Sequence, residues 1–75
     1  MDELLQILDE IHGGVDYENC TTLIDDGILD SFDIISIITE VSTAFDVQIP
    51  ANEIVPDNFN SAAALWKLIE RLEDE

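Results

Sequence analysis

The feature that most constrains this chain is an isoleucine-rich stretch that follows an acidic, glycine-containing loop. Its apolar side chains recur at the i, i+3, i+4, i+7 spacing that indicates a helix over residues 31–45. They are Ile34, Ile37, Ile38, Val41 and Phe45. Ile35 widens this stripe, so we expect neighbouring elements to cover the helix on two sides. A chain with such a helix must bury it in a largely helical core.

The start of this helix carries polar residues in a capping arrangement. Asp30 suits the N-cap position, and Asp33 follows three residues later, close to the capping-box pattern. Ser31 then lies in the first turn with its hydroxyl toward solvent. The unpaired N–H groups and the partial positive charge of a helix start suit a phosphate ester there. The spacing alone also leaves open that Ser31 is only a capping residue.

The first thirty residues predict one helix and a long connection. A helical stripe indicates a helix over residues 2–12, ended by Gly13-Gly14, and its members are Leu4, Ile7, Leu8 and Ile11. The connection spans residues 15–30, and Asp25-Asp26-Gly27 in it indicates a turn with glycine in an unusual backbone angle. Apolar residues should anchor the connection to the helices. They are Val15, Tyr17, Leu23, Ile28 and Leu29.

The last third of the chain predicts a short helical turn and a final helix. Pro50 breaks the chain, and residues 51–55 form one short turn closed by Pro56. Residues 57–60 are expected to be a loop with Phe59 pointing inward. The last helix is capped by Asn60 or Ser61 and runs to about residue 72. Its expected buried stripe is Ala62, Leu65, Trp66, Ile69 and Leu72.

These elements predict an all-α fold. We expect residues 1–75 to form a single domain, a small four-helix bundle with three main helices, one short helix and a long first loop. A chain of 75 residues can build only a small core.

The charge of the chain restricts its partners. Eighteen acidic residues face two basic ones, which gives a formal net charge of −16. Binding to nucleic acid is therefore excluded as a function, and basic protein surfaces are the favoured partners. No apolar run approaches the length of a membrane span, and the N-terminus lacks the positive region of a signal peptide. We expect a cytoplasmic monomer with no membrane insertion.

The residues that could support catalysis or metal binding are few. His12 and Cys20 are the only histidine and cysteine, so no disulfide or zinc pair is possible within the chain. As a nucleophile pair they lack an orienting third group. The acidic loop lacks the residue order of a calcium-binding EF-hand loop. We therefore expect no metal site and no catalysis.

Two stretches resemble the acyl carrier protein family. Residues 23–32, Leu-Ile-Asp-Asp-Gly-Ile-Leu-Asp-Ser-Phe, resemble its prosthetic-group attachment motif. Residues 45–50, Phe-Asp-Val-Gln-Ile-Pro, resemble the end of the family's second helix and the entry to its short third helix. The family usually has leucine where this chain has Phe32. The stretch from Gly27 to Ser31 is also similar to D-alanyl carrier proteins.

The resemblance implies a non-catalytic carrier. A phosphopantetheinyl transferase would attach 4′-phosphopantetheine from coenzyme A to Ser31. The arm would carry acyl or aminoacyl groups as thioesters between loading and transfer enzymes, for fatty acid, polyketide or related biosynthesis. An alternative is a D-alanyl or aminoacyl carrier loaded by an adenylating ligase. An alternative of another class is an acidic protein-interaction module without a prosthetic group.

Partner enzymes with basic docking surfaces should recognise the acidic start of the second predicted helix. We expect Asp30, Asp33 and Glu40 to supply the charged contacts. Ile34 or Ile37 would add an apolar contact if its side chain is exposed.

Overall fold

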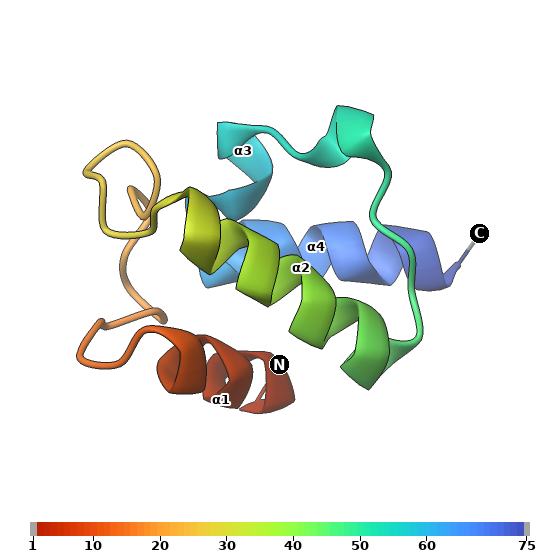
Figure 1. Cartoon of the computed structure of the whole chain (residues 1–75), viewed down its shortest axis with the longest axis horizontal. Helices are drawn as coiled ribbons and strands as arrows, with labels where there is room; N and C mark the ends of the chain where they lie inside the picture. Colours follow the sequence, from red (N-terminus) through yellow and green to blue (C-terminus); the bar gives the residue numbers. More distant parts are fainter. Residues whose placement is uncertain (1, 75) are drawn as a thin grey trace.

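The computed structural model describes residues 2–74, which contain helices and no strand; Met1 and Glu75 lie outside this range. The α-helices are α1 (Asp2–Ile11), α2 (Ser31–Phe45), α3 (Pro56–Phe59) and α4 (Ala62–Glu73), and a 3₁₀ helix, η1, spans Ala51–Glu53. Helix α1 packs against α2 and α4, and α3 packs against α4 (Figure 1). The predicted all-α bundle is confirmed. None of the helices in this range is long and apolar enough to cross a membrane.

Helix α1 presents its predicted stripe to the core. Leu4, Ile7 and Leu8 are buried, whereas Ile11 is only partly buried. The helix ends at Ile11, one residue before the predicted end, although the His12 amide still donates to the Leu8 carbonyl oxygen at 2.8 Å. Gly14 then turns the chain with a φ of 81°, a backbone angle that glycine adopts without steric cost.

Helix α2 has the predicted bounds because both of its ends are marked by side-chain or backbone geometry. Asp30 forms a complete capping box with Asp33 at the start. At the other end, Asp46 adopts a left-handed conformation with φ 53° and ψ 49°, which stops the helix. Near that end the Phe45 ring meets Trp66 of α4 edge-on, with ring centroids 5.6 Å apart.

The burial of α2 corrects one prediction. Ile37 and Val41 are fully buried, but Ile35 is 60% exposed and does not widen the buried stripe. Helix α2 packs chiefly on α1, and the side of α2 that bears Ile35 is left open to solvent.

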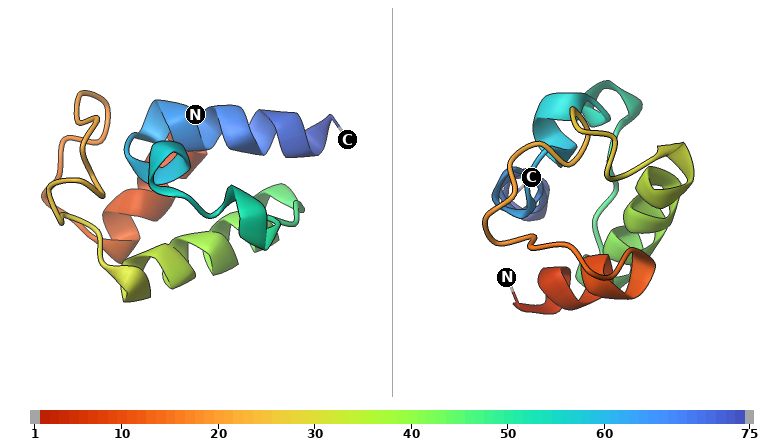
Figure 2. Two further views of the ribbon diagram at one scale, coloured as in Figure 1. Left: turned by 90° about the horizontal axis from the view of Figure 1, so that it is seen from above. Right: turned by 90° about the vertical axis from the view of Figure 1, so that its left-hand side faces the viewer.

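The long connection between α1 and α2 wraps around one end of the bundle (Figure 2). Tyr17, Leu23 and Leu29 are buried in the core, so they anchor the connection as predicted. Its expected turn is present, with Gly27 at a φ of 70°. The connection therefore has a defined course, although it contains no helix or strand.

The region between α2 and α4 differs from the prediction. Residues 57–60 were expected to be a loop, but Pro56 begins the short helix α3 instead of closing the preceding turn. Proline suits the first position of a helix, because its fixed φ is already helical and its missing N–H would be unpaired there. Phe59 points inward as predicted.

Helix α4 is capped by the Ser61 hydroxyl, which accepts from the Ala64 amide at 3.0 Å. The predicted buried stripe omits Leu68, which is fully buried, and includes Trp66 and Leu72, which are only partly buried. The face toward the core is therefore centred on Leu65, Leu68 and Ile69.

Candidate functional site

The candidate site is the start of α2. Ser31 is the first residue of the helix and is exposed to solvent. The Asp33 amide donates to the Asp30 carboxylate at 2.9 Å, and the Asp30 amide donates to the Asp33 carboxylate at 3.4 Å. Asp30 is therefore the capping residue, which leaves the alternative role of Ser31 as the cap without support.

Asp33 also joins the start of α2 to the end of α1. Its carboxylate lies 3.1 Å from His12 Nδ1, and only 20% of its side chain is exposed. The Tyr17 hydroxyl donates to the carbonyl oxygen of the same histidine. Asp33 was expected to face solvent as a partner contact, but its carboxylate is instead engaged within the fold. This contact fixes the first turn of α2 against α1.

His12 and Cys20 have different neighbours. His12 contacts Asp33, whereas the Cys20 sulfur lies 3.8 Å from the Thr22 hydroxyl. Within residues 2–74 no group of three or more histidine, cysteine or acidic side chains is arranged to hold a metal ion.

The other predicted partner contacts divide into exposed and buried residues. Asp30 and Glu40 are exposed, and Ile34 is partly buried. Ile37 is 0% exposed, so its prediction as a possible surface contact is wrong. Its side chain lies in the core that α2 forms with α1.

The sequence reasoning missed two exposed apolar residues next to Ser31. Phe32 is 78% exposed and Ile35 is 60% exposed. They are three residues apart and so share one face of α2, which we call the apolar face. Phe32 lies outside the helical stripe from Ile34 to Phe45, and this offset was a sequence signal for its exposure. Ile35 was expected to widen that stripe, so its exposure had no such signal in the sequence.

An apolar hollow of about 90 Å³ lies beside the start of α2. The long connection, the first turns of α2 and the segment from η1 to α3 enclose it. Its lining residues are Ile24, Ile34, Ile54, Val55, Pro56 and Phe59. Ile54 and Val55 are each 40% exposed, so the rim of the hollow is itself apolar.

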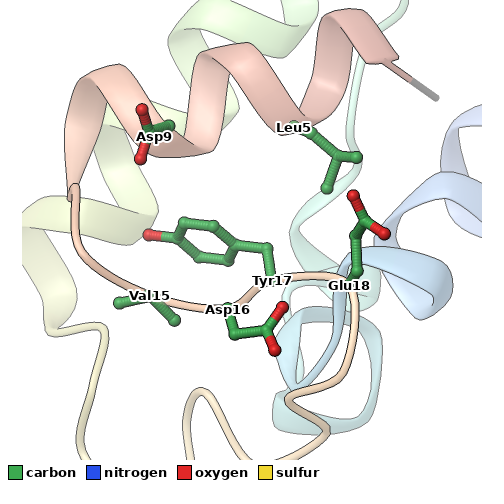
Figure 3. A pocket seen from close by; sticks show the side chains of 6 residues that line it. All are labelled: Leu5, Asp9, Val15, Asp16, Tyr17 and Glu18. Carbon is green, nitrogen blue, oxygen red and sulfur yellow. The ribbon is translucent and has the colours of Figure 1, made fainter.

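A second hollow, of about 200 Å³, lies between α1 and the long connection (Figure 3). Its lining residues are Leu5, Asp9, Val15, Asp16, Tyr17 and Glu18. Burial raises the pKa of Tyr17 to about 12, and the negative charges of Asp33 and Asp9 add to this effect. The acids give this hollow a negative potential, which disfavours anionic ligands.

Among curated proteins, the D-alanyl carrier protein of Lactococcus lactis subsp. lactis (strain IL1403) is similar to this chain. The two are 34% identical over 53 residues, which make up 71% of this chain and 67% of the relative. No protein-family profile and no solved structure matches the chain. The similarity agrees with the resemblance seen in the attachment motif and in the helical fold.

Proposed function

The chain belongs to the carrier protein family, and from that premise we propose that it carries a D-alanyl or other aminoacyl group on a 4′-phosphopantetheine arm attached to Ser31. The observation that carries the proposal is the exposed serine at the first position of a capped helix. The protein itself has no catalytic part in this proposal. Loading and transfer enzymes act on the cargo, and this chain positions it.

The residues around Ser31 suit a phosphodiester. The first-turn N–H groups and the positive end of the α2 dipole favour an anion at this position. The two neighbouring carboxylates are held by the capping bonds, and that of Asp33 is also turned toward His12. When attached, the arm supplies a terminal thiol that carries the cargo as a thioester.

The size of the neighbouring hollow favours a small cargo. At about 90 Å³ it is smaller than the roughly 150 Å³ cavity that accommodates one benzene molecule. A long acyl chain would remain largely outside it, whereas an alanyl group exposes little apolar surface. The similarity to a D-alanyl carrier protein points the same way. We therefore favour loading by an adenylating ligase over a fatty acid or polyketide role.

The attachment is tested by intact mass after incubation with coenzyme A, Mg²⁺ and a broad-specificity phosphopantetheinyl transferase. The wild type should gain one phosphopantetheinyl mass and one thiol, whereas Ser31→Ala should gain neither. Ser31→Ala should remain folded because Asp30 caps α2. Ser36→Ala, which changes another exposed serine of α2, is the matched control and should be modified normally.

A wild type that several transferases leave unmodified would favour the alternative of an acidic interaction module without a prosthetic group. The cargo is tested separately on the modified protein. An adenylating ligase with ATP and D-alanine should add one alanyl mass that hydroxylamine removes. Efficient loading by a long-chain acyl ligase, with no loading of D-alanine, would contradict the aminoacyl assignment.

We also propose that partner enzymes bind the apolar face of α2 together with its acidic neighbours. Phe32 and Ile35 are 78% and 60% exposed. Of the partner contacts predicted from the sequence, Asp30 and Glu40 are also exposed, and Ile34 is partly buried. A basic partner with an apolar depression complements this surface. Asp33 contributes to it only through the position of the helix.

The binding surface is tested by measuring association with the modifying transferase and the loading ligase. Glu40→Lys should slow association and flatten its salt dependence, and Phe32→Ala should speed dissociation. Glu3→Lys makes the same charge change on α1 and should have a smaller effect. Equal effects of the two charge reversals would mean that only net charge matters.

A further inference from the structure

The segment that leads to Ser31 is held in place by one distant residue. Asn60, between α3 and α4, accepts three hydrogen bonds from consecutive amides of the long connection. Its side-chain oxygen Oδ1 accepts from the Ile24 amide at 2.9 Å and from the Asp25 amide at 3.0 Å. Its backbone oxygen accepts from the Leu23 amide at 2.9 Å. The two side-chain bonds join residues that are far apart in the sequence: Ile24 is 36 residues and Asp25 is 35 residues from Asn60.

The connection has its own internal bonds, and these do not use the same amides. The Asp26 amide donates to Thr22 at 2.8 Å, and the Leu29 amide donates to Leu23 at 3.0 Å. These bonds close the turn on itself and lead directly to the Asp30 cap. The internal bonds therefore set the shape of the turn, and the contacts with Asn60 set its position relative to α3 and α4.

The Asn60 side chain does for this turn what a capping residue does for a helix. The N–H groups at the start of a turn lack local partners, and a side-chain oxygen can satisfy them. Here that oxygen comes from another part of the chain. The contact also holds Ile24 at the wall of the apolar hollow, which Ile54 and Val55 also line.

We infer that Asn60 is a positioning residue for the modification of Ser31. This inference rests on the proposed function, since it concerns the presentation of Ser31 to the transferase. The Asn60 side chain fixes the turn over residues 23–27, the turn fixes Asp30 through Leu29, and Asp30 begins the helix at Ser31. Loss of this side chain lets the turn and the attachment site shift together.

The test compares Asn60→Ala, which removes the acceptor, with Asn60→Asp, which keeps an oxygen in its place. In Asn60→Ala, amide hydrogen exchange at Ile24 and Asp25 should accelerate about tenfold. The Leu23 amide should change little, because its partner is a backbone oxygen. The kcat/KM of the transferase for Ser31 should fall about tenfold and should recover in Asn60→Asp.

Asn58→Ala is the matched control. The Asn58 side chain donates to the Glu53 carbonyl oxygen at 2.7 Å, within the η1–α3 segment, and has no bond to the turn over residues 23–27. Its substitution should leave the transferase rate near that of the wild type. Equal losses in Asn58→Ala and Asn60→Ala would overturn the inference, because the common cause would then be the packing of α3.

Three other results would also overturn it. They are modification of Asn60→Ala at the wild-type rate, failure of Asn60→Asp to restore the rate, and global unfolding of Asn60→Ala by circular dichroism. If the wild type is not modified at all, the proposed function fails. The exchange rates of Ile24 and Asp25 then decide on their own whether Asn60 positions the turn.

Discussion

Tyr17 ties the long connection to the end of α1. Its ring is buried between α1 and the connection, and its hydroxyl donates to the His12 carbonyl oxygen at the end of α1 (Figure 3). Burial raises its pKa from about 10 to about 12, and the charge of Asp33 at the start of α2 adds to the shift. The folded protein therefore holds this phenol in its neutral form.

The raised pKa makes the stability of the fold depend on pH in the alkaline range. The unfolded chain loses the Tyr17 proton near pH 10, whereas the folded chain keeps it until about pH 12. The stabilisation is thus complete below about pH 10 and is lost as the pH rises toward 12, by up to about 3 kcal/mol. Urea unfolding across this range measures the loss.

Tyr17→Phe is the control for this prediction. It should abolish the alkaline loss, and at neutral pH it should cost about 1 kcal/mol for the missing hydrogen bond. Because the chain has one tyrosine, the ultraviolet absorbance of phenolate follows Tyr17 alone. Ionisation of the folded protein near pH 10 would contradict the prediction.

At the scale of elements, α2 has one buried side and one exposed apolar side. Ile37 lies in the core and Ile35 lies on the apolar face, although the two residues are chemically identical and only two positions apart. Their side chains point about 200° apart around a helix with 3.6 residues per turn. One helix thereby supplies both core packing and the exposed apolar face that we propose as the partner surface.

This arrangement predicts different costs for the same substitution at the two sites. Ile37→Val should lower the free energy of unfolding by about 1 kcal/mol, because it leaves a cavity in the core. Ile35→Val should change it by less than about 0.5 kcal/mol, since the site is exposed. Urea unfolding of both variants measures the difference. Similar costs would mean that the exposed side of α2 is wrongly assigned.

The elements also show what local sequence could and could not predict. The start of α2 was predictable because Asp30 and Asp33 mark it by local capping chemistry. The exposure of Ile35 was not, because a helix with so many isoleucines does not reveal by composition which side meets a neighbour. Asn60 was predicted as a possible cap of α4, but it bonds to amides in the distant connection. No local pattern encodes such a contact.

At the scale of the whole molecule, negative charge is barely compensated. The chain has two basic residues against eighteen acids. One of them, Arg71, lies 3.0 Å from Glu53 and links α4 to η1 at the surface. An exposed ion pair of this kind contributes at most about 1 kcal/mol. Repulsion among the acids therefore opposes the compact state.

Screening should relieve this repulsion. We expect the melting temperature to rise from low to moderate NaCl concentration, and to rise further with millimolar Mg²⁺ through diffuse binding to the acids. Calorimetry or circular dichroism at several salt concentrations measures the effect. A non-ionic osmolyte at matched osmolality controls for general solvent effects. A melting temperature that is independent of ionic strength would contradict the argument.

Asp46, which has a left-handed backbone conformation at the end of α2, is a site where a substitution should raise thermal stability without changing Ser31. Asp46 places a side chain in a backbone region that favours glycine, and it places a negative charge at the negative end of a helix dipole. Asp46→Gly should therefore raise the free energy of unfolding by about 0.5–1 kcal/mol, and Asp46→Asn should give part of this gain. Thermal unfolding measures both variants, and a lower melting temperature for Asp46→Gly would contradict the expectation. A more heat-tolerant form with an unaltered Ser31 would let the proposed modification of that serine be assayed at temperatures where the wild type unfolds.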